Sequence, residues 1–238
     1  MKTLIKRVLS LTPYRVLQGP PNRFDAIEDT LKRLARCNYR PTLIVDGGAH
    51  LGSFATMAAA IFPSSKMPMF EPQPSGSPAL ATLAANRGFA FSPVALGAER
   101  KTARLWAGAS PGTGASIATE EGDGQVVIEV STLDLELSDT AVAHNSMLKL
   151  DLQGYEMEAL KGAAGRLRAF EVILSEVSFF AQAYEPSPLE LISYLDRQGF
   201  QLLDVCALAG RRRDGRLKQG DLLFARSDSA LMTDTRWE

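Results

Sequence analysis

The sequence contains few of the residues on which metal centres and disulfide frameworks depend. Among its 238 residues are two cysteines and two histidines. Cys37 and Cys206 lie far apart and no C-x-x-C motif is present, so neither a zinc site nor a disulfide framework is expected. His50 and His144 are too few for a histidine-rich metal centre.

An excess of one charge and a long apolar run are also missing. The 26 basic and 27 acidic residues give a formal net charge of −1, which offers no overall attraction to nucleic acid or an anionic membrane. No apolar run reaches the roughly 18 residues of a membrane helix. The basic start, Met1 to Leu9, is too short and too charged for a secretory signal. We therefore expect a cytoplasmic protein without a nucleic-acid partner or an integral membrane segment, and leave its oligomeric state open.

What the sequence does contain is an alternation of strand and helix patterns. Apolar runs predict strands at 43–45, 66–70, 89–96, 148–151 and 172–176. Helical periodicity predicts helices at 24–37, 54–62, 79–87, 157–167 and 188–198. Two strand-like segments without helices between 97 and 131 predict a β insertion, and the segments 200–208 and 221–225 predict a closing hairpin. Such an alternation is typical of a doubly wound α/β domain.

We expect three parts along the chain. They are a helical lead-in over 1–40, the α/β domain over 41–226 with its insertion at 97–131, and a polar tail over 227–238.

The segment "LIVDGGAHLGSF", residues 43–54, places a glycine-containing turn between a strand and a helix. Such turns hold nucleotide-like ligands in α/β proteins. The dinucleotide pattern G-x-G-x-x-G is absent, because Ala49 stands two residues after Gly47 and His50 two after Gly48. Asp46 at the strand end is expected to repel a pyrophosphate unless water or a lysine intervenes. An NAD-dependent oxidoreductase is therefore the less favoured alternative.

A ligand that lacks phosphate and carries a positive centre suits this turn better, and S-adenosylmethionine has that character. Glycine at 48 and 52 would let its methionine moiety lie against the backbone. Glu71, at the end of the next predicted strand, can accept hydrogen bonds from both ribose hydroxyls. The predicted cofactor contacts are Asp46, Gly48, Ala49, His50, Gly52, Glu71, Pro72 and Leu96.

The segment "MLKLDLQGYEMEALKGA", residues 147–163, places several polar side chains at the carboxyl end of another strand. An alcohol acceptor needs a general base within about 3 Å. Asp151 is the first candidate, Glu176 the second and Glu156 the third, although its place in the first turn of a helix favours a dipole-stabilising role. The predicted substrate contacts are Gln153, Tyr155 and Ser116. No metal is predicted, and a divalent cation held by paired acids stays the less favoured alternative.

Taken together, "VDGGAHLGSF", "MFEPQP", "STLD" and "LKLDLQGYEMEALKGA" resemble FkbM-type S-adenosylmethionine-dependent methyltransferases, from about residue 40 to residue 226. Two positions depart from the family pattern: Gly47 stands where an aliphatic residue is commoner, and His50 where asparagine is commoner. The resemblance implies that the turn and the second-strand acid hold the cofactor, through Asp46, Gly48, Gly52 and Glu71. It places the following segment beside the transferable methyl, through Asp151, Gln153, Gly154 and Glu156.

The resemblance also implies a fold and an activity. The fold is the mostly parallel, seven-stranded class I methyltransferase (Rossmann-like) sheet, with the β insertion between strands three and four and an antiparallel final strand. The activity is O-methylation of a hydroxyl on a sugar, a glycan or another small metabolite. A non-catalytic cofactor-binding module of the same fold remains the alternative from a different class.

Two further segments have open interpretations. The glycine-rich stretch 108–124 is either a lid that recognises the acceptor or a plain hairpin connection. The run Arg211 to Arg216 contains Asp214 and Gly215, which predict a hairpin tip with solvated arginines. The alternative is that this run forms an anion-binding site for a phosphorylated or acidic acceptor.

Overall fold

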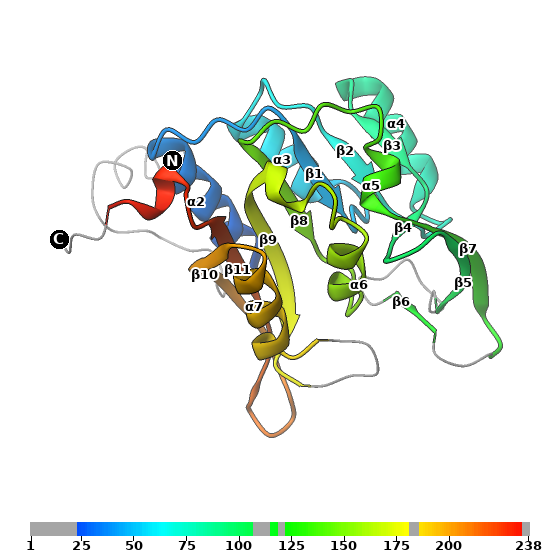
Figure 1. Ribbon diagram of the computed structural model, residues 1–238. Coiled ribbons are helices and arrows are strands. Elements are labelled where there is room, and N and C mark those ends of the chain that lie inside the picture. Colours follow the sequence, from blue (N-terminus) through cyan, green and yellow to red (C-terminus); the bar gives the residue numbers. More distant parts are fainter. Residues whose placement is uncertain (1–22, 107–114, 119–121, 181–185, 235–238) are drawn as a thin grey trace, which may run out of the picture.

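A mixed seven-stranded sheet forms the centre of the computed structural model, which describes residues 23–106, 115–118, 122–180 and 186–234 (Figure 1). Its strands, in spatial order, are β10 (Phe200–Arg211), β11 (Leu217–Arg226), β9 (Phe170–Ser178), β8 (Ser146–Leu150), β1 (Ile44–Gly47), β2 (Pro68–Phe70) and β3 (Ala90–Ser92). β11 is antiparallel to both of its neighbours, and the other pairs are parallel. The predicted seven strands, mostly parallel with an antiparallel last strand, are therefore confirmed.

Helices cover both faces of this sheet because its strands are apolar on both sides. One face carries α2 (Arg23–Arg36), α3 (Ser53–Ile61) and α4 (Ser77–Arg87). The other face carries α5 (Leu133–Glu136), α6 (Glu156–Lys161) and α7 (Pro188–Arg197). Neighbouring strand residues point to opposite faces, so Ile44 packs in the first cluster and Val45 in the second. The domain is doubly wound, as predicted.

A second, four-stranded sheet occupies the predicted β insertion. Its strands, in spatial order, are β4 (Ala95–Leu96), β7 (Gln125–Ser131), β5 (Lys101–Trp106) and β6 (Ser116–Ile117). A small apolar cluster of its own includes Leu105, Ile128 and Val130. Most of the glycine-rich stretch falls on residues 107–114 and 119–121, which lie outside the described residues. The prediction of a lid in this stretch therefore stays untested.

Two predicted elements were wrong in extent. The single strand expected over 89–96 is broken at Pro93 into β3 and β4, which belong to different sheets. Proline lacks the N–H that would continue the ladder. The helix expected to continue to Leu167 ends at Lys161. The chain then passes the second sheet so closely that a Cβ on Gly162 would lie 1.9 Å from the carbonyl oxygen of Gly97.

Both described ends of the chain pack on the domain. The predicted lead-in helix is α2, and its Ile27, Leu31 and Leu34 are buried as expected. In the expected polar tail, Ser229 is buried and its hydroxyl donates to Glu171. Within the described ranges, no helix combines the length and the apolar character needed to cross a membrane.

Candidate active site

A cavity of about 370 Å³ opens where the parallel strands end. The carboxyl edge of an open α/β sheet is where such folds bind their ligands. Its walls come from α2 and from the segments that follow β1, β2, β3 and β8, and they also include part of β11. We call it the larger cavity.

The turn after β1 is folded tightly against the ends of β2 and β8. The N–H groups of Gly48 and Ala49 both donate to the carbonyl of Phe70, at 2.9 and 3.0 Å. Gly48 has a φ of +74°, and a Cβ there would lie 1.9 Å from the carbonyl oxygen of Asp151. Glycine at 48 is therefore required by the packing of the protein itself, and not only by room for a ligand.

Glu71 connects this turn to the loop after β2. It is buried, and its carboxylate accepts from the backbone N–H of His50 at 2.8 Å and of Gln73 at 2.9 Å. A carboxylate offers about four acceptor positions, so Glu71 can accept further bonds from a ligand. His50 has a φ of +51°, and its buried Nε2 has no hydrogen-bond partner in the part of the chain that is described.

Asp46 lies behind the turn and not in the cavity. It is fully buried and forms an ion pair with Nζ of Lys149 at 2.9 Å. Nζ of Lys149 also donates to the carbonyls of Gly47 and Gly48, at 3.1 and 2.8 Å. Lys149 is the intervening lysine for which the prediction made an exception, so Asp46 gives no argument against a pyrophosphate.

The hydrogen bonding of the turn gives a better argument against a dinucleotide. Pyrophosphates bind free backbone N–H groups at such turns. Here the N–H groups of Gly48, Ala49 and His50 already have protein acceptors, and that of Gly52 donates to the carbonyl of Ala49 at 2.7 Å. These four N–H groups of the turn are therefore not free to bind a phosphate.

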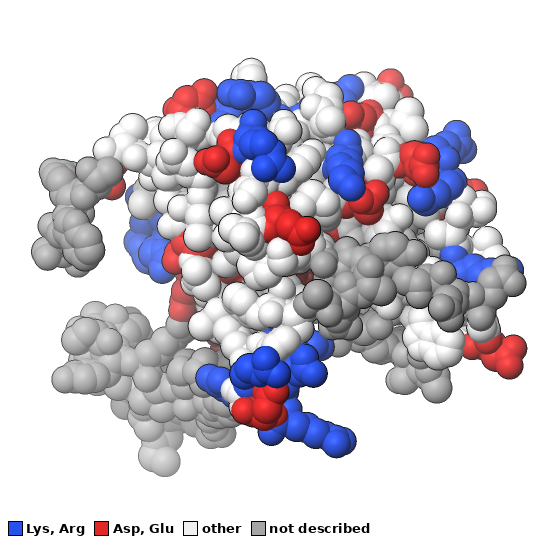
Figure 2. All heavy atoms as spheres, turned by 60° about the horizontal axis from the view of Figure 1, so that its bottom comes forward, with Lys and Arg blue, Asp and Glu red and all other residues white. Residues whose placement is uncertain are grey.

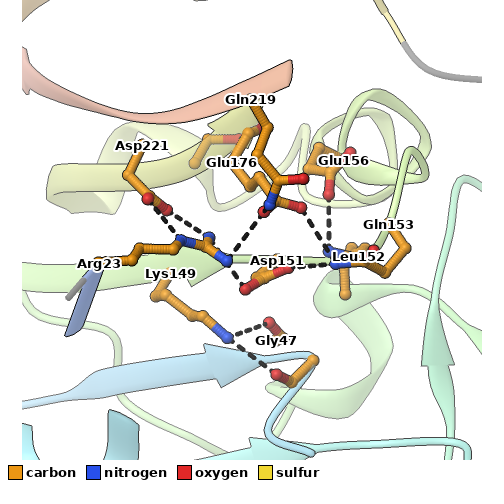
Figure 3. A network of polar contacts seen from close by, with 12 residues as sticks. Arg23, Gly47, Lys149, Asp151, Leu152, Gln153, Glu156, Glu176, Gln219 and Asp221 are labelled. Carbon is orange, nitrogen blue, oxygen red and sulfur yellow. Dashed lines mark hydrogen bonds and ion pairs between the residues drawn. The ribbon is translucent and has the colours of Figure 1, made fainter. Parts of the chain in front are cut away.

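Another part of the cavity wall holds the guanidinium of Arg23 with the carboxylates of Asp151 and Asp221, and a third carboxylate beside the guanidinium, Glu176, does not line this cavity (Figure 3). Arg23, at the start of α2, contacts Asp221 through two bonds of 2.6 and 2.5 Å. It also lies 3.1 Å from Asp151 and 2.9 Å from Glu176. We call Asp151, Glu176 and Asp221 the acid cluster.

Two glutamine side chains complete the hydrogen bonds of this cluster. The Gln153 side chain donates to Asp151 at 2.8 Å and to Glu176 at 3.1 Å. Gln219, on β11, donates to Glu176 as well. Gln153 has a φ of +52°, and such backbone strain is typical of functional sites.

The surroundings of Asp151 and Glu176 drive their pKa values apart. Burial alone would raise the pKa of Asp151, but the charges of Lys149 and Arg23 lower it below its ordinary value. Burial, with the charge of Asp151 beside it, raises the pKa of Glu176 to about 9. At neutral pH, Asp151 is therefore ionised, and Glu176 holds a proton that it shares in a hydrogen bond with Asp151.

Glu156 accepts hydrogen bonds from the loop that precedes it. Its two oxygens accept from the N–H of Leu152 at 2.6 Å and of Gly154 at 3.1 Å. Together with Glu176 and Ser116, it lines a smaller cavity of about 140 Å³ beside the larger one. This geometry suits a residue that shapes the loop more than it suits a general base.

The structure brings most of the predicted site residues together. The larger cavity is lined by Gly48, Ala49, His50, Glu71, Pro72, Leu96, Asp151, Gln153 and Tyr155. The smaller cavity is lined by Ser116, Gln153, Glu156 and Glu176. Asp46 and Gly52 line neither cavity. Gly52 has a φ of +79° and packs against Leu83, so both of these residues support the turn from behind.

Sequence reasoning missed Arg23, Lys149, Gln219 and Asp221. A signal was available for two of them, because Lys149 and Asp221 interrupt the otherwise apolar strand segments "MLKL" and "GDLLFA". Charged side chains are rarely buried in a strand unless they are paired. Arg23 gave no such signal, since a polar residue at the start of a helix is ordinary.

Comparison with known protein families adds an independent finding. Residues 46–202 match the family described as the methyltransferase FkbM domain. No curated protein matches the chain significantly in sequence.

Solved structures of similar shape are remote in sequence. An FkbM methyltransferase from Methylobacillus flagellatus KT is 16% identical, with 76% of this chain and 43% of that chain covered and a TM-score of 0.47. This chain thus spans less than half the length of that relative. A precorrin-6y C5,15-methyltransferase from Geobacter metallireducens GS-15 is 10% identical, with coverages of 90% and 93% and a TM-score of 0.49.

A third such structure is a 1,6-didemethyltoxoflavin-N1-methyltransferase from Burkholderia thailandensis with bound S-adenosylhomocysteine. It is 14% identical, with coverages of 91% and 95% and a TM-score of 0.40. The family match, by contrast, extends over more than half of the chain. On that evidence this protein belongs to the FkbM methyltransferase domain family.

Proposed function

We propose that this protein is an S-adenosylmethionine-dependent O-methyltransferase that acts on a hydroxyl of a sugar or another small polar metabolite. One observation carries the proposal. A single cavity is lined by Glu71, beside a turn whose Gly48, Ala49 and His50 N–H groups already have acceptors, and by an ionised carboxylate, Asp151. Membership of a methyltransferase family supports it. A cytoplasmic location and the acceptor class stay predictions from sequence.

The larger cavity fits the proposed cofactor in size and chemistry. Its volume of about 370 Å³ is within the range of small-molecule sites. Glu71 would accept the ribose hydroxyls, and the apolar Val94 and Leu96 offer a wall for the adenine ring. S-adenosylmethionine supplies a methyl group on a positively charged sulfur, which the ionised Asp151 in the lining of this cavity would favour.

The acid cluster and its neighbours account for the remaining chemistry. Methyl transfer is an in-line displacement, so alignment of the acceptor provides most of the acceleration. Asp151 accepts the proton of the acceptor hydroxyl, since it is ionised and faces the cavity. Gln153 and the protonated Glu176 hold the Asp151 carboxylate in place through hydrogen bonds.

The smaller cavity is the proposed acceptor pocket. Its lining includes the polar side chains of Ser116, Gln153 and Gln219, which suit a ligand rich in hydroxyl groups. It shares Gln153 and Gln219 with the larger cavity. An acceptor held there would therefore meet the methyl group close to Asp151.

A methyl-transfer screen tests this function. Radiolabelled S-adenosylmethionine is offered with sugar, lipid-linked and polyketide hydroxyl acceptors, and transfer to at least one class is expected. With that acceptor, Asp151→Asn should lower turnover by about 10²- to 10⁴-fold, because the general base is lost. Asp139→Asn, the same change at an exposed position, should leave turnover unaltered. Binding of S-adenosylhomocysteine without transfer to any acceptor would favour a non-catalytic module instead.

A further inference from the structure

Residues 211–218, at the turn between β10 and β11, concentrate positive charge in a protein that is otherwise acidic. We call this segment the basic hairpin. It contains Arg211, Arg212, Arg213, Arg216 and Lys218 against the single acid Asp214, a net charge of +4. The rest of the chain then has 21 basic and 26 acidic residues, a net charge of −5. Figure 2 shows a group of Lys and Arg side chains at the lower end of the molecule, the end where the hairpin projects in Figure 1.

The basic hairpin lies at the edge of the sheet that carries both cavities. β10 runs parallel to β9, and both are antiparallel to β11, so the tip follows the carboxyl end of β10. Ser178, the last residue of β9, pairs with Gln219, so the hairpin extends past the end of β9. Lys218 and Gln219 line both the larger and the smaller cavity. Lys218 is thus part of the lining of the proposed acceptor pocket, and the arginines follow toward the tip of the hairpin.

The aromatic ring of Phe180, two residues after the end of β9, contacts two guanidinium groups of the basic hairpin. The Cζ atoms of Arg212 and Arg216 lie 4.4 and 4.9 Å from the ring centroid of Phe180, within the distance of a cation–π contact. Phe180 follows the end of β9. Such contacts reduce the freedom of long side chains that would otherwise sample many rotamers. The two arginines are therefore partly ordered before any ligand arrives.

Much of this charge is not neutralised by the protein. Asp214 accepts three bonds from Arg216, at 3.0, 3.0 and 2.7 Å, so its charge is already paired. Arg212, Arg213 and Lys218 form no ion pair with any described residue. These three exposed cations of one hairpin exceed the charge of a single carboxylate on a ligand.

We propose that the basic hairpin binds the phosphate groups of the acceptor, which is a sugar joined to a diphosphate. This inference rests on the proposed function and names its substrate class. Guanidinium groups match phosphate oxygens with paired hydrogen bonds. At a strand rise of about 3.3 Å per residue, Lys218 and Arg216 lie roughly 10 and 17 Å along β11 from Asp221. That separation leaves room for a sugar ring between the reacting hydroxyl at the acid cluster and the diphosphate.

Calorimetry with uridine diphosphate as the probe tests this inference in the presence of saturating S-adenosylhomocysteine. The wild-type protein should bind the probe, and Arg212→Gln/Arg216→Gln should bind it about tenfold more weakly or worse. Arg87→Gln/Arg100→Gln removes the same charge from exposed positions elsewhere and should leave the affinity unaltered. Affinity for S-adenosylhomocysteine should be equal in all three proteins.

The outcomes separate this inference from the proposed function. Failure to bind S-adenosylhomocysteine would contradict the function, whereas normal cofactor binding with equal probe affinity in all three proteins would overturn only the hairpin's role. Hairpin-dependent binding to vesicles containing phosphatidic acid, without binding of uridine diphosphate, would support phosphate recognition and assign it to a lipid-linked acceptor. Hairpin-dependent binding of a short RNA, tighter than that of the diphosphate, would overturn the proposal in favour of a nucleic acid.

Discussion

The two walls of the larger cavity are built in different ways. The turn wall, Gly48 to Gly52 with Glu71, is held by backbone hydrogen bonds between segments that are close in the sequence. The acid cluster is held by side-chain charges from four separate elements, and its Arg23–Asp221 contact joins residues 198 positions apart. The turn wall therefore depends on backbone geometry, and the acid cluster depends on charge balance. The two meet where Gly48 lies against the backbone of Asp151.

The largest effect is expected where the two walls meet. Gly48→Ala would bring a Cβ within 1.9 Å of the Asp151 carbonyl oxygen and would impose a φ of +74° on alanine. We expect a loss of about 3–5 kcal/mol in the free energy of unfolding, measured with urea. Gly88→Ala is the matched control, because Gly88 has a similar φ of +67° and nothing within 4 Å of its Cβ position. It should lose only about 1–2 kcal/mol, and equal losses would show that the contact at Gly48 is not tight.

Removal of the cation from the acid cluster should have the next largest effect. Arg23→Met leaves Asp151 and Asp221 without their shared guanidinium, and the expected loss of unfolding free energy is roughly 2–3 kcal/mol. This is below the value for a fully buried pair, because the Arg23 side chain is 17% exposed. Arg33→Gln, on the same helix, breaks an exposed pair with Asp204 and a hydrogen bond to Thr30, and it should cost about 0–1 kcal/mol.

The same Arg23 variant also tests the independence of the two walls. Arg23 lines the larger cavity, but its ion pairs are with the acid cluster and not with the turn, so Arg23→Met should weaken binding of S-adenosylhomocysteine by less than Glu71→Ala does. If Arg23→Met weakened that binding as much as Glu71→Ala does, the cavity would act as one unit and the comparison would fail.

A smaller effect is expected from the proton on Glu176. Its pKa is raised from 4.5 to about 9 by burial and by Asp151, so between these values the unfolded chain releases a proton that the folded chain keeps. The contribution of Glu176 to stability is thus complete below pH 4.5 and is lost as the pH rises toward 9. Glu176→Gln has no such proton. From pH 6 to pH 7 its stability should rise by about 1–2 kcal/mol relative to the wild type, as followed by thermal unfolding. Parallel pH profiles would contradict the raised pKa.

The sequence predicted the turn wall better than the acid cluster, for a physical reason. The turn at Gly48 and the acid at Glu71 come directly after strands that are evident from short apolar runs. Because the carboxyl ends of parallel strands share one edge of the sheet, residues at these ends are expected to lie close together. Asp151 and Glu176 were accessible to the same rule. Arg23 and Asp221 were not, because a helix before the domain core and an antiparallel strand at its end meet only through tertiary packing.

Other differences between prediction and structure arose where contacts between distant segments decide the local structure. Pro93 carried a readable signal that the third strand would break, since it has no N–H to donate. The shortened α6 carried none, because its end follows from the approach of Gly162 to Gly97, the residue after β4 of the second sheet. The charge of Asp46 was evident from the sequence, but its neutralisation required knowing that Lys149 of β8 lies beside it.

The most direct test of the central claim, that the turn wall holds S-adenosylmethionine and not a dinucleotide, is a calorimetric comparison of S-adenosylhomocysteine and NAD as ligands. We predict a clear isotherm for S-adenosylhomocysteine, none for NAD, and about tenfold weaker binding of the former by Glu71→Ala, which loses the acceptor of the ribose hydroxyls. A clear isotherm for NAD with none for S-adenosylhomocysteine would contradict the claim.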